Sequence, residues 1–350
     1  MNISSTWLTV NRNCNLFCKW CYAQDYLGGQ ECMSLDLAKT LIDIATICGS
    51  KSIFLIGGEP TIHPNFMEIL TYILSKNLKA IVVTNGLILE SCEFCSQISQ
   101  LDSCKVHFGI SIKGATDEEY EVNCGKRGFT SLLAGIKNCK KHGFSYSLSY
   151  VLTEENVNHV EDFAHNIVNN NIDKNISFII CNDTLDHRGN VQKNSTHPLV
   201  IDEILSKHYD NLCEIMDYKL SLHQTLPLCQ CNEDLLGKMI AKNQITTSCH
   251  VHRRNGLIFD TDGSLLLCNN LPGFKVGEFG TDYKDADSLR KFWDSDYAIN
   301  LYKKFTTMPS IECKECEKSS LCGGGCCVQW FSNDFESYKK FKNKGEIICH

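Results

Sequence analysis

Three cysteines near the start of the chain have a spacing that suits metal binding. Cys14, Cys18 and Cys21 form a Cys-x3-Cys-x2-Cys pattern in this sequence of 350 residues. Three thiolates leave one iron of a [4Fe–4S] cluster without a protein ligand, because such a cluster takes four. A small molecule can bind at the open iron and be transformed there. A structural zinc site is the alternative, but it usually closes with a fourth ligand, and the next cysteine or histidine is Cys32.

A short motif, Gly57-Gly58-Glu59-Pro60, follows an apolar run and precedes an amphipathic one. Glycines let the backbone approach a ligand closely, and a carboxylate such as that of Glu59 accepts hydrogen bonds from an ammonium group. An ordinary strand-to-helix turn is the alternative.

A second set of cysteines occupies the C-terminal region. Cys249 is followed after 13 residues by Gly263 and after four more by Cys268. The set continues, with 2, 5, 3 and 22 residues between successive members, through Cys313, Cys316, Cys322, Cys326 and Cys349. Several iron–sulfur ligands or a treble-clef-like zinc module would both use such clusters of thiols.

These motifs resemble the radical S-adenosylmethionine (radical SAM) superfamily, in particular members with a C-terminal SPASM domain. In that family the three N-terminal cysteines hold a [4Fe–4S] cluster whose open iron chelates SAM, and the reduced cluster cleaves SAM to a 5′-deoxyadenosyl radical. The Gly-Gly-Glu-Pro motif holds the SAM amino group. The resemblance implies that SAM is bound by Tyr22, Gly57, Gly58, Glu59, Pro60, Asn85, Ser111 and Lys113. Many relatives have Asp at the position of Lys113.

The SPASM resemblance implies two auxiliary [4Fe–4S] clusters, so that the chain would hold three clusters in all. Cys249, Cys268 and Cys326 would hold the first together with Cys231, or with Cys229 in its place. The second would be held by Cys313, Cys316, Cys322 and Cys349. Four thiolate ligands leave no open iron, so these clusters would conduct electrons or stabilise the fold.

Strand-like apolar runs alternate with amphipathic segments from residue 5 to about 185. The pattern predicts strands at 7–10, 52–56, 80–83, 107–110, 146–151 and 176–180, and helices at 34–48, 65–76, 88–100, 130–142 and 156–169. Such alternation predicts an α/β fold with a parallel sheet and with functional loops at the carboxyl ends of the strands. We therefore expect a partial (β/α)6 TIM-like barrel followed by a small cysteine-rich iron–sulfur SPASM domain.

The expected domains are the radical SAM partial barrel at 1–185, a helical connector at 186–245 and the SPASM auxiliary cluster domain at 246–350. The connector is more polar than the barrel and contains a helical stretch near 199–221. The last region has short segments, glycines and clustered cysteines, and it would depend on metal for stability.

Composition narrows the cellular setting and the partners. A net charge of −7 argues against a nucleic-acid partner, which needs a basic surface. The basic stretch 339–344 is explained by a solvated helix face, or it meets an acidic peptide or an electron donor. Neither a secretory signal nor a membrane-spanning segment is visible, so the 22 cysteines favour metal ligation in the cytoplasm over extracellular disulfides.

The resemblance implies a peptide-modifying radical SAM oxidoreductase, a maturase that abstracts hydrogen from a ribosomally made peptide to form a crosslink or an oxidised residue. A flavodoxin- or ferredoxin-type reductant would supply electrons. Related crosslinking enzymes often begin with a module that grips the leader peptide, whereas this chain begins at the first strand, so either a separate leader-binding protein or a surface of this enzyme is expected to bind the leader. In sulfatase-maturing relatives an Asp base follows the cysteine matching Cys268; here Asn269 cannot take a proton.

Three alternatives remain open. A SAM-dependent dehydrogenase or epimerase of another substrate would share every motif, whether its substrate is a small molecule or a sulfatase-type protein. A non-enzymatic iron–sulfur electron carrier would need neither the open iron nor the Gly-Gly-Glu-Pro motif.

Several further side chains are candidates for radical or proton transfer. A thiol near the radical can donate a hydrogen atom, and the candidates are Cys124, Cys181 and Cys327. Cys92 and Cys95 have the spacing of a redox pair, but two structural thiols on a helix explain them as well. The candidate proton acceptors are Asp25, His63, Asp183 and His187.

Overall fold

The computed structural model describes most of the chain. The described residues are 1–24, 31–181, 183–185, 191–192, 198–223, 227–246, 249–306, 313 and 315–328. Four predictions made from the sequence lie outside the described residues: Asp25, His187, Cys349 and the basic stretch 339–344.

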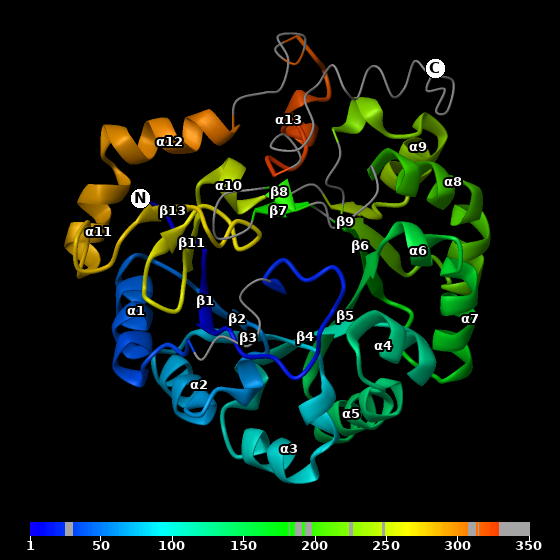
Figure 1. Cartoon of the computed structure of the whole chain (residues 1–350), viewed down its shortest axis with the longest axis horizontal. Coiled ribbons are helices and arrows are strands. Elements are labelled where there is room, and N and C mark those ends of the chain that lie inside the picture. Colours follow the sequence, from blue (N-terminus) through cyan, green and yellow to red (C-terminus); the bar gives the residue numbers. More distant parts are fainter. Residues whose placement is uncertain are drawn as a thin grey trace.

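In the described part of the chain, one sheet of 11 strands has the order β10-β9-β6-β5-β4-β3-β2-β1-β11-β12-β13. Every pairing from β10 to β11 is parallel, whereas β12 and β13 add antiparallel. The main strands are β1 (Ser5–Asn11), β2 (Ser52–Gly57), β3 (Lys79–Thr84), β4 (Val106–Ile112), β5 (Ser145–Leu152), β6 (Ile176–Ile180), β9 (Leu220–His223), β10 (Ile245–Thr246), β11 (Gly256–Phe259), β12 (Leu265–Leu266) and β13 (Lys275–Gly277). A separate hairpin pairs β7 (Thr184–Leu185) with β8 (Val191–Gln192). The strands form an incomplete ring with the helices outside it (Figure 1).

The helices that cover the ring follow the strands in the chain. They are α1 (Leu35–Ile47), α2 (Phe66–Ser75), α3 (Cys92–Ser99), α4 (Asp117–Cys124), α5 (Phe129–His142), α6 (Glu154–Val157), α7 (Val160–Asn169), α8 (Pro198–Ile215), α9 (Glu233–Ala241), α10 (His250–Arg253), α11 (Ala286–Trp293), α12 (Asp296–Thr306) and α13 (Ser319–Cys322). Local sequence explains many helix ends: the Ser34 side chain caps the amino end of α1, and Gly143 ends α5 in the left-handed conformation. Among the described residues, no helix combines the length and the apolar character needed to cross a membrane.

The α/β partial barrel predicted from the sequence is confirmed, and the sheet extends beyond the six predicted strands. The segment predicted as a helical connector contributes β9 and β10 at one edge. The helix predicted near 199–221 ends at Ile215. From Leu220 to His223 buried and half-buried residues alternate, which is the pattern of a strand rather than of a helix. At the other edge β11 pairs with β1, with Ser5 opposite Gly256, so the C-terminal region continues the barrel sheet.

Helix α4 was not predicted, and its sequence explains why. Its residues have no clear apolar face, since three acidic residues form its first turn. The Thr116 side chain accepts a hydrogen bond from Glu119 at the amino end, and Gly125 ends the helix in the left-handed conformation. Capping therefore defines this helix more than periodicity does.

Candidate functional site

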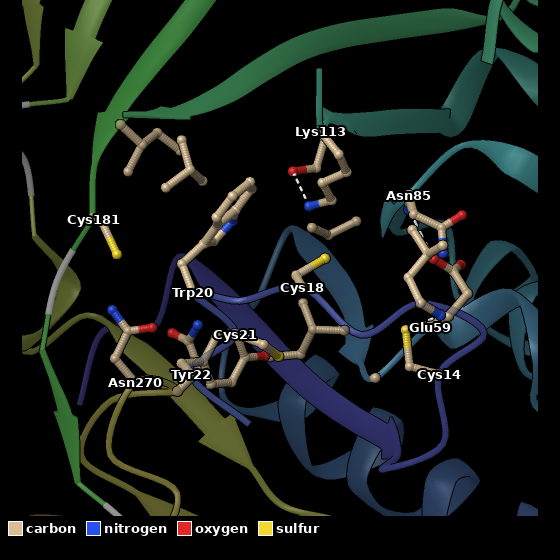
Figure 2. A pocket seen from close by; sticks show the side chains of 18 of the residues that line it. Cys14, Cys18, Trp20, Cys21, Tyr22, Glu59, Asn85, Lys113, Cys181 and Asn270 are labelled. Carbon is tan, nitrogen blue, oxygen red and sulfur yellow. Dashed lines mark hydrogen bonds between the residues drawn. The ribbon is translucent and has the colours of Figure 1, made fainter. Parts of the chain in front are cut away.

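The three N-terminal cysteines lie on one loop inside the barrel. The loop leaves the carboxyl end of β1 and turns into the ring of strands (Figure 1). Cys14, Cys18 and Cys21 all line a cavity of about 420 Å³ (Figure 2). Backbone hydrogen bonds from Arg12 N to Glu31 O (3.0 Å) and from Met33 N to Val10 O (2.8 Å) hold the two ends of the loop together. The fold thus presents three thiols to one cavity.

The electrostatics of these thiols fit a cationic metal centre. Burial raises the pKa of Cys14 to about 11, and negative charge on Glu59, Cys18 and Cys21 raises it further. Burial also raises the pKa of Cys21. Three thiolates in this space would repel one another, and bound iron would remove that penalty because metal binding deprotonates its cysteine ligands. The residues present therefore fit a cluster with three protein thiolates.

The glycines of the Gly-Gly-Glu-Pro motif hold the chain that begins the cysteine loop. A Cβ atom on Gly58 would lie 2.2 Å from the carbonyl oxygen of Asn13, and one on Gly57 would lie 2.4 Å from that of Asn11. Gly58 N donates to Asn11 O (3.0 Å), and Glu59 N donates to Asn13 O (2.8 Å). We expected glycine here for close approach to a ligand, but the close approach in the structure is to the neighbouring backbone.

Glu59 is the buried anchor of this motif, with only 1% of its surface exposed. Its Oε1 atom accepts hydrogen bonds from Thr61 N (3.2 Å), Thr61 Oγ1 (2.6 Å) and Thr84 Oγ1 (2.8 Å). Its Oε2 atom accepts a hydrogen bond from Asn85 N (2.8 Å). Burial raises the pKa of the carboxyl group, and the four hydrogen bonds lower it by a smaller amount. The arrangement leaves acceptor capacity on Oε2, next to the cavity that Glu59 lines.

Asn85, Ser111 and Lys113 lie at the carboxyl ends of β3 and β4, and all three line the cavity (Figure 2). Asn85 Nδ2 donates to Asn15 Oδ1 on the cysteine loop (2.7 Å), and Lys113 Nζ donates to Ser111 Oγ (2.7 Å). The first contact ties the end of β3 to the cysteine loop, and the second lies within the end of β4.

Tyr22 and Pro60 complete the predicted SAM-binding set. Tyr22 lines the cavity beside Cys21, hydrogen-bonds to Asn269, and has its pKa raised to about 12 by burial. Pro60 is buried and begins a short 3-10 turn, Pro60–Ile62. The structure therefore gathers the predicted N-terminal ligands and SAM-binding residues around one cavity, with Pro60 behind Glu59.

The inner wall of the barrel is lined by serines, which local sequence patterns did not reveal. The strand register pairs Ser111 with Ser149, Ser149 with Ser177, and Ser177 with Ser221. These four half-buried residues form one row across β4, β5, β6 and β9, which we call the serine row. TIM-barrel interiors are usually filled by branched apolar side chains. The serine row instead offers hydroxyl groups, and its first member, Ser111, lines the cavity.

A buried ion pair, also missed from the sequence, joins the cysteine loop to the C-terminal region. Arg12 follows β1 and is 2% exposed, and its guanidinium donates to the carboxylate of Asp260, which follows β11. Because β1 and β11 are parallel neighbours, their carboxyl ends meet here. The two residues are separated by 248 positions, so no local pattern pointed to the pair.

Replacing Asp260 with alanine is expected to destabilise the protein by about 3–5 kcal/mol, because it removes the carboxylate that pairs with the buried guanidinium of Arg12. The free energy of unfolding would be measured by denaturant titration. Asp262→Ala is the matched control: its ion pair with Lys275 is largely exposed, so a loss below about 1 kcal/mol is expected. Equal losses in the two variants would contradict the role given to the buried pair.

The second set of cysteines is only partly described. Cys326 lies close enough to Cys249 and Cys268 to raise the pKa of both, and Cys249 raises that of Cys268, in addition to the larger effect of burial on these two thiols. Cys231 lies elsewhere, packed with Leu228 next to Cys322, whose sulfur accepts a hydrogen bond from Leu228 N (3.2 Å). Among the residues that the structure describes, no three metal-ligating side chains converge tightly enough to hold an ion.

The predicted proton acceptors His63 and Asp183 lie in different surroundings. His63 is buried and fully bonded: Nδ1 accepts from Asn65 N (3.0 Å), which leaves Nε2 to donate to Met33 O (2.9 Å). This ring is a structural link, and the prediction of a proton acceptor at His63 is not supported. Asp183 is buried near Cys181, whose sulfur points into the cavity from the wall opposite Cys14 (Figure 2).

The other predicted thiols have structural contacts. Cys327 hydrogen-bonds to Cys326. Cys95 is buried in α3, where its thiol donates to Leu89 O (3.3 Å), while Cys92 is exposed at the amino end of the same helix.

Comparison with known proteins identifies the first half of the chain. Residues 8–167 match the model of the radical SAM superfamily. This segment contains the cysteine loop and the Gly-Gly-Glu-Pro motif described above. This segment is therefore a radical SAM domain, and that family implies a [4Fe–4S] cluster and SAM as cofactors.

Curated relatives align mainly with this half. The Fe-coproporphyrin III synthase of Methanosarcina barkeri is 30% identical over 149 residues, 42% of this chain and 37% of the relative. The antilisterial bacteriocin subtilosin biosynthesis protein AlbA of Bacillus subtilis is 29% identical over 161 residues, 45% of this chain and 35% of the relative. The cysteine-type anaerobic sulfatase-maturating enzyme of Clostridium novyi is 21% identical over 336 residues, 91% of this chain and 86% of the relative. The chain thus spans about a third of the length of the first two relatives.

Two solved structures share the fold along nearly the whole chain. Native anSMEcpe with bound AdoMet and Cp18Cys peptide has a TM-score of 0.70 at 20% identity, over 98% of this chain and 96% of that one. Streptococcus suis SuiB bound to precursor peptide SuiA has a TM-score of 0.68 at 15% identity, over 95% of this chain and 73% of that one. These likenesses establish the fold.

Proposed function

We propose that this protein is a radical SAM peptide maturase, an oxidoreductase that abstracts hydrogen from a ribosomally made peptide to form a crosslink or an oxidised residue. When bound, the reduced cluster and SAM supply a 5′-deoxyadenosyl radical. The observation that carries the proposal is that the thiols of Cys14, Cys18 and Cys21, the carboxylate of Glu59 and Ser111 of the serine row all line one cavity.

Each group in the cavity has a proposed role in SAM binding. Oε2 of Glu59 accepts from the SAM ammonium group, and the hydrogen bonds to Thr61, Thr84 and Asn85 fix the carboxylate in place. Gly57, Gly58 and Pro60 set the turn that presents it. The remaining polar side chains, which meet the adenosine or the SAM carboxylate, are those of Tyr22, Asn85, Ser111 and Lys113.

The serine row supports a polypeptide as the substrate. Neighbouring strands lie about 4.8 Å apart, so a row across four strands spans about 14 Å, the length of roughly four extended residues. Its hydroxyls can donate to or accept from peptide groups, which an apolar barrel lining cannot do. Two compared proteins are also connected with peptides by name: the subtilosin biosynthesis protein AlbA and SuiB bound to its precursor peptide SuiA.

The double variant Ser149→Ala/Ser177→Ala is expected to lower peptide modification about tenfold, chiefly through a higher KM, because it removes two hydrogen bonds of about 0.5–1.5 kcal/mol each. SAM cleavage without peptide should stay unchanged. Ser145→Ala is the control, because Ser145 is bonded to His107 at the amino end of the same strand as Ser149. Unchanged kinetics in the double variant would remove the serine row from substrate binding.

We further propose two auxiliary [4Fe–4S] clusters in a SPASM domain at 246–350, after the barrel at 1–185 and the connector at 186–245. The mutual proximity of Cys249, Cys268 and Cys326 supports their sharing one cluster. Cys231 or Cys229 would complete it; the neighbouring Leu228 N donates to the sulfur of Cys322 (3.2 Å). The second cluster would use Cys313, Cys316, Cys322 and Cys349. A flavodoxin- or ferredoxin-type protein would supply electrons, and a separate protein would bind the leader peptide.

The test is anaerobic incubation of the reconstituted enzyme with SAM, reductant and a short peptide encoded beside its gene, in deuterated buffer, followed by mass spectrometry. A peptide that loses two hydrogens supports the proposal. Gain of one deuteron at a carbon would indicate an epimerase instead. An unmodified peptide, with 5′-deoxyadenosine still formed, would favour another substrate, including a small molecule.

Sulfatase maturation is a second candidate, because the Clostridium novyi relative aligns over 91% of this chain. Asn269 argues against it, since its amide cannot act as a base and is bonded to Tyr22. A sulfatase-derived peptide with a cysteine at the modification site should therefore yield no aldehyde in the same assay. Aldehyde formation would make this candidate the better one.

A further inference from the structure

A histidine at the end of β9 lines the same cavity as the groups proposed to bind SAM. This residue, His223, shares a face of its strand with Ser221, because Leu220 and Leu222 are buried while Ser221 and His223 are half-buried. His223 therefore continues the line of Ser221, a member of the serine row, by one pleat toward the carboxyl ends of the strands. Its ring belongs to the wall of the space in which SAM and the substrate would meet.

The neighbours of His223 across the sheet are apolar. The strand register places His223 opposite Ile179, and Ile179 opposite Val151, and all three residues line the cavity. In the described part of the chain the imidazole makes no hydrogen bond, and burial lowers its pKa. The ring is therefore neutral at pH 7, and one of its two nitrogens is a free acceptor.

Each of the other ionisable groups in the cavity wall is engaged or keeps its proton. These groups are the three thiols of the cysteine loop, Tyr22, Glu59, Lys113 and Cys181. The loop thiols and Glu59 are assigned to the cluster and to SAM, and Lys113 Nζ donates to Ser111 Oγ (2.7 Å). Burial raises the pKa of Tyr22 and of Cys181 to about 12, so both keep their protons at pH 7. Among the described residues that line the cavity, His223 is therefore the one suited to accept a proton.

The proposed oxidation releases a proton, and the amide of Asn269, which also lines the cavity, cannot take it. We propose that His223 is the catalytic residue that accepts this proton. After hydrogen abstraction a peptide carbon holds one unpaired electron, and a neighbouring X–H group, in which X is sulfur, nitrogen or oxygen, supplies an electron pair. Two of these three electrons form the C–X bond, one passes to an auxiliary [4Fe–4S] cluster, and the proton of X–H passes to the imidazole. The inference rests on the proposed function, which supplies the peptide radical and the electron acceptor.

The experiment compares His223→Gln with the wild type in the assay of the peptide encoded beside the gene, at saturating SAM. Glutamine keeps a polar side chain but cannot take a proton, so the rate at which the peptide loses two hydrogens should fall by about 100-fold or more. Formation of 5′-deoxyadenosine with peptide present should continue, because hydrogen abstraction precedes the proton transfer. Peptide affinity, measured with SAM but without reductant, should equal that of the wild type.

Two further measurements separate a base from a structural residue. In the wild type the rate of two-hydrogen loss should fall as the pH drops through the lowered pKa of His223, because a protonated ring cannot accept a proton, and this dependence should be absent from His223→Gln. In His223→Ala, added imidazole should restore two-hydrogen loss, since it can occupy the space of the missing ring.

His107→Gln is the matched control, because His107 is another half-buried histidine of the sheet whose pKa burial lowers, but it is bonded to Ser145 and does not line the cavity. Its rates should equal those of the wild type. Wild-type loss of two hydrogens in His223→Gln would overturn the proposal, as would a fall in peptide affinity that accounts for the lower rate. If the glutamine variant fails to fold, absence of rescue by imidazole in His223→Ala overturns it. A wild-type enzyme that forms 5′-deoxyadenosine but leaves the peptide unmodified would instead contradict the proposed function.

Discussion

Replacing Cys14 with alanine is expected to abolish 5′-deoxyadenosine formation while auxiliary iron remains bound. Cys14 lies on the loop inside the barrel, whereas the C-terminal thiols Cys249, Cys268 and Cys326 interact with one another. The two sets are therefore expected to bind metal independently, and loss of one of only three thiolates is expected to disable the SAM-binding cluster. The product would be measured by liquid chromatography and the iron by chemical analysis of the anaerobic protein.

Cys32→Ala is the control for this change. Cys32 is exposed and joins the base of the same loop through its backbone, which alanine preserves. It should form 5′-deoxyadenosine at the wild-type rate. Retention of product by Cys14→Ala would remove Cys14 from the cluster, and loss of all iron would show that the two sets of thiols are not independent.

Glu59→Gln is expected to weaken SAM binding by at least tenfold. The glutamine amide oxygen still accepts hydrogen bonds from Thr61 and Thr84, but the negative charge is lost. The amide NH2 group then faces another donor, either Asn85 N–H or the SAM ammonium. Glu59→Ala should also lower stability, by about 1–3 kcal/mol for each buried donor left without its partner. Equilibrium dialysis with SAM and thermal unfolding would separate the two effects, with exposed Glu68→Gln on α2 as the control.

Burial raises the pKa of Glu59 above its ordinary value, which fixes the sign of the pH effect. A protonated carboxyl group cannot pair with an ammonium, so SAM affinity should fall as the pH drops through the raised pKa. In the absence of SAM, the free energy of unfolding falls as the pH rises toward the raised pKa, because the buried carboxyl group must then carry a charge. Bound SAM offsets this loss. If Glu59→Gln bound SAM as tightly as the wild type at every pH in this range, the carboxylate would not have the proposed role.

Local patterns in the sequence determined much of the fold. The six predicted strands and their main helices were found because alternation in buried strands and 3.6-residue periodicity in amphipathic helices are properties of short segments. The cysteine spacing and the Gly-Gly-Glu-Pro motif are equally local, and they pointed to the cavity that the structure contains. Helix α4 escaped because its ends are set by caps rather than by an apolar face.

Contacts between distant segments were decided only by the tertiary structure. The strand register aligned Ser111, Ser149, Ser177 and Ser221 into one row, although each is an unremarkable serine in its own strand. The parallel pairing of β1 and β11 brought Arg12 to Asp260 across 248 positions. The physical reason is the same in both cases: periodicity indicates which face of a segment is buried, while the partners of that face depend on the order and register in which the segments pack.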